Sequence, residues 1–387
     1  MADLLSKLRM LDAEPKRASP PPRPASAACG GYYHDQAVFP LSLFSDRGHI
    51  RPDVLESAFG SPFPPDTRPE DILFLDTETT GLSGGVGTVA FEVGIGYFAP
   101  TGFVVEQFLM HDYPEEGAML SALNALMRRF PVLCTFNGRT FDMPLLRSRF
   151  LMNRISHPNL PQAHADVLFP ARRLWKLRLK SCTLANLERQ LLGVEREDDL
   201  PGALVPQTYF QYLKDGVFAP LKKVLEHNKQ DIVSLAQLLC FLCRQVAQPE
   251  HMAYGEDLFS MARAMEKNGQ MERAMHCYRL TAQTTMRADA CAAMARIEKR
   301  NGHVEAAVKL YQSLLNQNSS AADACEALAK LYEHQLRDLP GAISYTRQAL
   351  LILSEPTLFR DASVQDKQIA LQYRYARLRR KLDAQSK

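Results

Sequence analysis

Residues 72–81, ILFLDTETTG, join a short apolar run to two acids. Four consecutive large apolar residues at 72–75 are typical of a strand that is buried on both faces. Because alternate side chains of a strand share a face, Asp76 and Glu78 are expected on one side of it. Two neighbouring carboxylates repel each other unless a cation holds them, and carboxylate oxygens suit Mg²⁺ or Mn²⁺. A solvated strand end is the alternative interpretation of an isolated pair.

The segments that follow extend this strand into a domain. Residues 89–98 and 103–110 are β-rich, and residues 118–130 have helical spacing. Residues 132–136 are another apolar run of strand length, after which the pattern to about residue 245 is mostly helical. Strands first, and then alternating strand and helix, predict an α/β domain around a mixed sheet.

A second acid follows the run at 132–136, within the segment NGRTFD at 137–142. This spacing places Asp142 in the first turn of the next predicted helix. An acid in that position also interacts favourably with the helix dipole, so Asp142 alone does not identify a site.

The third motif is HNKQD at 227–231, inside a predicted helix over 221–243. Residues four apart share a helix face, so His227 and Asp231 are expected to point the same way. An imidazole beside a metal-bound carboxylate can accept a proton from water near neutral pH. A local hydrogen bond is the simpler explanation of such a pair when it stands alone.

In this order, the patterns hhhhDTETTG, NxxxFD and HxxxD resemble the three motifs of the DEDD (DnaQ-like) 3′–5′ exonuclease superfamily, which has an RNase H-like fold. The resemblance implies a phosphodiester hydrolase in which His227 is the general base and four acids bind two divalent cations, Mg²⁺ or Mn²⁺. Those four acids are Asp76, Glu78, Asp142 and Asp231. The superfamily places histidine five residues before the last Asp, or tyrosine four before it. This chain has histidine at the tyrosine spacing.

A narrower resemblance covers roughly residues 65–350. It rests on the segments LDTETTGLSGGVGTVAFEVGIGYF, TFNGRTFDMPLL, ADVLFPARRLW and LLGVEREDDLPGALVPQTYFQYL. They are similar to the YprB-like group, which includes the mitomycin-repair exonuclease MrfB and carries C-terminal tetratricopeptide repeats. The resemblance implies a DNA-repair nuclease that works with a superfamily 2 helicase, and it favours DNA over RNA. An exoribonuclease of the same fold and a catalytically silent repeat scaffold are the alternatives.

The C-terminal third repeats with a period of 33 to 34 residues. The recurring positions are Ala262, Ala295 and Ala329, Gly269 and Gly302, and the pairs Ala274–Tyr278 and Ala307–Tyr311. Small residues at this period predict tetratricopeptide-like helix pairs over residues 255–380, with an irregular helical bundle as the alternative. The exonuclease domain is then expected over residues 65–250. Residues 1–60, rich in Pro, Ser and Ala, are predicted to be a flexible arm.

Composition limits the class of protein. The 387 residues include 46 Lys and Arg against 43 Asp and Glu, a net charge of +3, which excludes a binder that depends on bulk positive charge. No run approaches the ~18 apolar residues of a membrane span, and the first residues lack a signal-peptide core. The eight cysteines, including Cys240 and Cys243 in an apolar helical run, are expected to be free thiols. A cytoplasmic location is therefore predicted.

Several residues are predicted to contact nucleic acid. The glycine-rich loop 81–88 lacks the lysine of a phosphate-binding P-loop, but with Thr79 it would let backbone amides approach a terminal nucleotide. The complete set comprises Thr79, Gly81, Asn137, Arg172, Arg173 and Lys176. The three basic residues of this set surround Trp175, which is expected to be buried, and they face either phosphates or solvent.

Three further features have two interpretations each. Asp166 either supports the metal site or makes a structural hydrogen bond. The acidic turn at 197–202 is better explained as a turn and helix cap than as a spare metal or partner site. The basic segment 374–381 is either the closing helix of the repeats or an extra DNA contact.

Overall fold

The computed structural model describes residues 31–81, 87–196, 200–316, 321–354 and 362–385. Two predicted features, the interior of the glycine-rich loop at 82–86 and the acids at 197–199, lie outside the described residues. The chain divides into two compact units. Unit 1 contains the residues up to Ala171 together with Ser181–Arg244, and unit 2 contains Arg172–Lys180 and the residues from Gln245 onward.

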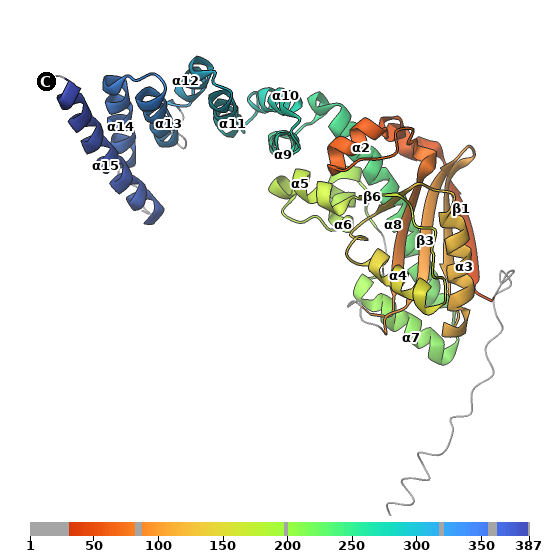
Figure 1. Cartoon of the computed structure of the whole chain (residues 1–387). Helices are drawn as coiled ribbons and strands as arrows, with labels where there is room; N and C mark the ends of the chain where they lie inside the picture. The colour runs from red at the N-terminus through yellow and green to blue at the C-terminus, as the bar shows by residue number, and fades with distance from the viewer. Residues whose placement is uncertain (1–30, 82–86, 197–199, 317–320, 355–361, 386–387) are drawn as a thin grey trace, which may run out of the picture. The chain divides into compact units, whose positions relative to one another are not determined.

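Unit 1 is built on a six-stranded mixed sheet with the strand order β1-β4-β3-β2-β5-β6 (Figure 1). The strands are β1 Tyr33–Phe39, β2 Ile72–Thr79, β3 Ala90–Ala99, β4 Gly102–Leu109, β5 Val132–Thr135 and β6 Ala163–Asp166. β2 pairs with β3 antiparallel and with β5 parallel. The predicted α/β fold with a mixed sheet is confirmed.

The helices of unit 1 fall largely where the periodicity predicts them. They are α2 Pro52–Phe59, α3 Glu116–Met127, α4 Asp142–Met152, α6 Leu184–Leu187, α7 Val205–Asp215 and α8 Ala219–Ala247, while α5 Leu168–Leu179 crosses the boundary between the units. Short helical turns are η1 Leu41–His49, η2 Pro69–Asp71, η3 Tyr113–Glu115, η4 Glu188–Leu192, η5 Gly202–Leu204 and, after α8, η6 Pro249–His251. Cys240 and Cys243 are buried on α8, as predicted, and burial raises the pKa of both thiols.

The core of unit 1 forms around β2. Leu73 and Leu75 are fully buried and belong to one cluster with Leu120 of α3 and Leu221 of α8. Burial of a side chain of this size contributes about 1.5–3 kcal/mol relative to its exposure to water. Burial of the apolar half of β2 in the core therefore fixes the position of the acidic half of the same strand.

The predicted flexible arm over residues 1–60 is wrong for its second half. β1 pairs with β4 along seven residues and forms an edge of the sheet, and Phe44 and Leu55 are buried. Proline is concentrated in the first thirty residues, and it dominates the amino-acid composition when that is averaged over residues 1–60. The averaged composition therefore does not indicate the short alternating strand at 33–39. Residues 1–30 lie outside the described part of the chain.

Unit 2 is all-helical, as predicted. Its helices after α8 are α9 Gly255–Lys267, α10 Met271–Thr281, α11 Arg287–Arg300, α12 Val304–Gln312, α13 Ala321–His334, α14 Leu339–Ser354 and α15 Ala362–Gln385. Each helix contacts the next one along the chain. The recurring small residues Ala262, Ala295 and Ala329 are fully buried. Gly269 and Gly302 follow α9 and α11 with φ of 76° and 84°, left-handed values that favour glycine.

The basic segment 374–381 is bound to a single buried acid. Glu333 of α13 has a side chain only 2% exposed, and its carboxylate accepts hydrogen bonds from Arg374 at 2.6 Å, Arg377 at 2.7 Å and Lys381 at 2.8 Å. All three donors belong to α15. Of the two interpretations of this segment, the contacts of these three bases favour a closing helix.

We expect Glu333→Gln to lower the stability of unit 2 in a pH-dependent way. Burial alone raises the pKa of Glu333, but the hydrogen bonds from Lys381 and Arg377 outweigh it and lower the pKa to about 2. A carboxyl whose pKa is lower in the folded state contributes stability that is complete above its ordinary value of 4.5 and is lost as the pH falls toward 2. The variant should be less stable than wild type at neutral pH by on the order of 2 kcal/mol.

Thermal denaturation at several pH values measures this difference. The gap between wild type and Glu333→Gln should close as the pH falls from about 4.5 to about 2. Asp383→Asn, which changes an exposed acid of α15, is the matched control. A gap that stays constant with pH would contradict the assignment.

Candidate active site

The acids of the first motif lie where β2 extends beyond its neighbour β5. The aligned residues of the two strands end at Phe74 opposite Cys134, so Asp76 and Glu78 project past the end of that pairing. Both carboxyl groups contact residues of α8, since Asn228 donates to Asp76 and His227 lies near Glu78. The prediction that the two acids share a face of the strand is confirmed.

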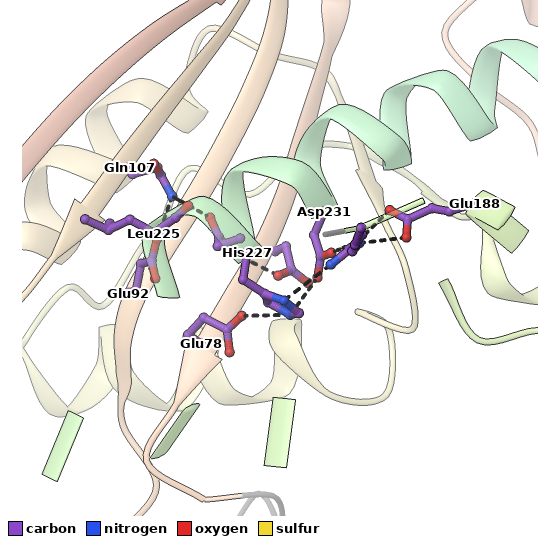
Figure 2. Close-up of polar contacts among 10 residues, drawn as sticks. Glu78, Glu92, Gln107, Glu188, Leu225, His227 and Asp231 are labelled. Atoms are coloured by element: carbon purple, nitrogen blue, oxygen red, sulfur yellow. Dashed lines mark hydrogen bonds and ion pairs between the residues drawn. The ribbon is translucent and has the colours of Figure 1, made fainter. Parts of the chain in front are cut away.

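Three side chains from β2 and α8 form a polar group that could hold a metal ion (Figure 2). Nε2 of His227 lies 3.9 Å from Oε1 of Glu78 and 3.5 Å from Oδ2 of Asp231. One ligand atom of each residue lies within 4.8 Å of the other two. His227 and Asp231 share a face of α8, as their spacing predicts.

Asp76 and Asp142 lie beside this group but outside it. Burial raises the pKa of Asp76 well above its ordinary value, and the charges of Asp231, Asp142 and Glu78 raise it further. Burial also raises the pKa of Asp142 to about 6, although Thr77 Oγ1 donates a hydrogen bond to Oδ1 of Asp142 at 2.5 Å. The charges of the other three predicted acids therefore all act on Asp76.

Asp166 holds the loop that leads to Asp142. Its buried carboxylate accepts backbone N–H groups of Asn137 at 2.8 Å and Arg139 at 2.9 Å. Asn137 has φ of 70°, a left-handed conformation that asparagine tolerates better than most residues. These contacts support the structural interpretation of Asp166, and they fix the point at which α4 begins with Asp142.

Arg196 connects the site to a second buried acid. Its guanidinium donates to Oδ1 of Asp231, and to Glu188 at 2.5 Å and 2.8 Å. Glu188 is only 1% exposed, so this pair is held in a protected environment. Neither residue is predicted to be functional from the sequence. Neither spacing nor composition signals a contact between residues 35 positions apart in different elements.

The contact with Arg196 favours one tautomer of a neutral His227. A guanidinium only donates, so Nδ1 of His227, 3.3 Å from Arg196, is an acceptor. The neutral imidazole then carries its proton on Nε2, the nitrogen that faces Glu78 and Asp231. A role as proton acceptor at Nε2 requires the other tautomer, in which this contact with Arg196 is given up.

Comparison with known proteins places this site in a family. Residues 73–243 match the RNase_H_2 family of the RNase_H superfamily. The "Uncharacterized protein YprB" of Bacillus subtilis (strain 168) is 30% identical over 289 residues, which are 72% of this chain and 69% of YprB. The chain belongs to the RNase H-like family that includes YprB. The RNase H-like fold predicted from the motifs is thereby confirmed.

One solved structure gives a weaker match. The family B DNA polymerase of the archaeon Pyrobaculum calidifontis aligns with 55% of this chain at 15% identity and a TM-score of 0.36. The aligned part is 30% of the polymerase chain.

The donor set of this RNase H-like protein fits divalent cations. RNase H-like nucleases use such metals, and the acids here offer the hard carboxylate oxygens that Mg²⁺ and Mn²⁺ prefer. The buried carboxyl of Asp76, opposed by the charges of three other acids, is an environment that positive charge stabilises.

The predicted nucleic-acid contacts of the RNase H-like protein remain predictions. Thr79 donates to the backbone oxygen of Gly81 at 2.9 Å, a bond that closes the turn after β2. Arg172, Arg173 and Lys176 are exposed on α5, and Trp175 is 1% exposed, as expected. Among the described helices, none is long and apolar enough to cross a membrane.

Proposed function

We propose that the protein is a metal-dependent 3′–5′ DNA exonuclease of the DEDD type. Asp76, Glu78, Asp142 and Asp231 would hold two divalent cations, Mg²⁺ or Mn²⁺. The observation that carries this proposal is that three acids from β2, α4 and α8 lie close enough to Asp76 for their charges to act on it, with a histidine beside two of the four. Buried like charges destabilise a fold, and their retention in one place is typical of a functional site.

The reaction is hydrolysis of the terminal phosphodiester. Bound cations would lower the pKa of a water and offset the negative charge that develops on the leaving 3′ oxygen. His227 would accept the proton of the attacking water at Nε2, which faces two of the acids, in the tautomer that gives up the contact of Nδ1 with Arg196. The oxygen of that water bonds to phosphorus, the bond to the 3′ oxygen breaks, and a 5′-mononucleotide leaves. Asp166 would contribute by keeping Asp142 at the start of α4.

Hydrolysis of 5′-labelled oligonucleotides tests the proposal. Single- and double-stranded DNA and matched RNA are incubated with Mg²⁺, with Mn²⁺ and with a chelator. We expect a ladder that shortens from the 3′ end of DNA, requires the metal and is faster on DNA than on RNA. A faster reaction on RNA would favour the exoribonuclease. Absence of cleavage with either metal on every substrate would contradict the proposal and favour the silent scaffold.

A role in DNA repair is part of the same proposal. The buried alanines at the 33–34-residue period support tetratricopeptide-like pairs in unit 2, a class of repeat that docks other proteins. The partner proposed is a superfamily 2 helicase, in the cytoplasm. Cells that carry Asp76→Asn should be as sensitive to a DNA crosslinking agent as cells without the protein. Wild-type resistance in those cells would contradict the repair role and leave the nuclease activity to be judged by the hydrolysis assay.

A further inference from the structure

Three neighbouring strands place one residue each in a row beneath α8. The strand register aligns Gln107 of β4 with Gly94 of β3, and Gly94 with Asp76 of β2. Residues aligned in this way on adjacent antiparallel strands have side chains on the same face. The middle position of the row has no side chain, so it leaves space between an amide on one side and a carboxylate on the other.

Asn228 of α8 fills that space. It is fully buried, and a β-carbon added to Gly94 would lie 1.8 Å from Oδ1 of Asn228. On one side Oδ1 of Asn228 accepts a hydrogen bond from Nε2 of Gln107 at 3.2 Å. On the other side Nδ2 of Asn228 donates to Oδ2 of Asp76 at 3.1 Å. The glycine on β3 therefore allows one amide from the helix to reach both neighbours.

Gln107 determines which end of the Asn228 amide faces Asp76. Nε2 of Gln107 also donates to Oε1 of Glu92 and to the backbone oxygen of Leu225, both at 2.7 Å (Figure 2). Three acceptors surround this amino group, which identifies it as the donor end of the Gln107 amide, and its two hydrogens are shared among them, with Asn228 the most distant. If the Asn228 amide were reversed, its oxygen would face the Asp76 carboxylate and its amino group would face another amino group. The arrangement thus selects one orientation of Asn228.

We propose that Asn228 is a positioning residue for the Asp76 carboxylate and that Gln107 acts on Asp76 through Asn228. The hydrogen bond at Oδ2 sets the rotation of the carboxylate and so the direction in which Asp76 presents its oxygens to a cation. The inference rests on the proposed function, because it assigns a partner to one of the proposed metal ligands. Groups that hydrogen-bond a metal ligand typically change metal affinity by about 10- to 100-fold.

A role limited to packing is the competing explanation. Asn228 and Gln107 also connect α8 to the sheet, so their loss is expected to lower stability under either explanation. Metal affinity separates the two, because packing alone does not orient Asp76. The fold should survive the loss of the Asn228 side chain, since Gln107 keeps Glu92 and Leu225 as acceptors for its two amide hydrogens.

The experiment is calorimetric titration of the full chain with Mn²⁺, which needs no substrate or turnover. We expect Asn228→Ala to weaken Mn²⁺ binding by about 10-fold and Gln107→Met to weaken it by at least about threefold. The double variant should bind Mn²⁺ no more weakly than Asn228→Ala, because Gln107 then has no amide to orient. Ser234→Ala is the matched control. Ser234 is a buried polar residue of the same helix that hydrogen-bonds Gln230, and its loss should leave the affinity within about twofold.

Each result supports or overturns the inference. Unchanged affinity in Asn228→Ala would overturn the positioning role and leave the proposed nuclease intact. Effects that multiply in the double variant would show that Gln107 does not act through Asn228. If circular dichroism shows Asn228→Ala unfolded, Gln107→Met decides alone, and wild-type affinity in it overturns the inference. Absence of Mn²⁺ binding in the wild type would overturn the proposed function together with the inference.

Discussion

Asp76→Asn should reduce hydrolysis by at least about 1,000-fold, because the cations that these carboxylates bind supply several kcal/mol of stabilisation to the transition state. The variant should fold normally. In a chelator it should be at least as stable as the wild type, since it removes a buried charge that Asp231, Asp142 and Glu78 oppose. Asparagine keeps the shape of the side chain and its ability to accept from Asn228. The loss of rate would therefore report chemistry and not misfolding.

Steady-state hydrolysis and thermal denaturation in chelator measure the two effects. Asp383→Asn, the same change at an exposed position of α15, is the control for rate. Asp231→Asn should be equally inactive, but less stable than Asp76→Asn, because Arg196 loses one of its carboxylate partners. Near wild-type rates in Asp76→Asn would show that the site is wrongly assigned.

Stability and activity should depend on pH in opposite directions. Burial raises the pKa of Asp142 from 3.8 to about 6. A carboxyl whose pKa is higher in the folded state contributes stability that is complete below its unfolded value and is lost as the pH rises through the folded value. Without metal, the protein should therefore lose about 3 kcal/mol of stability from this group between pH 4 and pH 6. Hydrolysis, which needs the deprotonated acids, should instead rise across pH 6 toward neutrality.

Thermal denaturation in chelator at pH 5 and pH 7.5 tests the first half of this prediction. Asp142→Asn should lose its own share of the difference between the two pH values, while Asp76 and Glu92, whose pKa values burial also raises, keep the remainder. Mn²⁺ should stabilise the wild type more at pH 7.5 than at pH 5. A metal-free protein that is equally stable at both pH values, with no effect of Asp142→Asn, would contradict it.

The features predicted from the sequence are those that short-range geometry determines. The apolar run before Asp76 forms a buried strand because four large side chains find a core on both faces of β2. Alternation along that strand puts Asp76 and Glu78 on one face, and a spacing of four brings His227 to within 3.5 Å of Asp231. The position of Asp142 at the start of α4 follows from the same kind of local pattern.

The features that the sequence does not reveal depend on contacts between distant segments. Arg196 lies in a stretch dominated by acids, and its partners become apparent only when η4 and α8 come together. Gly94 looks like an ordinary strand glycine, and its purpose depends on the register that sets it between Gln107 and Asp76. The prediction of a flexible arm is wrong at β1, because amino-acid composition averaged over sixty residues does not indicate a seven-residue strand.

The contact of α15 with Glu333 has a consequence for the order in which the chain folds during synthesis. The three bases that neutralise this buried acid follow it by 41 to 48 residues. While they are still inside the ribosome, α13 can bury Glu333 with only the exposed side chain of His334 beside it, at 3.5 Å, and burial of a charge so weakly compensated is unfavourable. The end of unit 2 should therefore become protected from proteases only after residue 381 has emerged, whereas unit 1 can fold earlier. Timing of protection on stalled nascent chains would reveal this delay, and Glu333→Gln should shorten it.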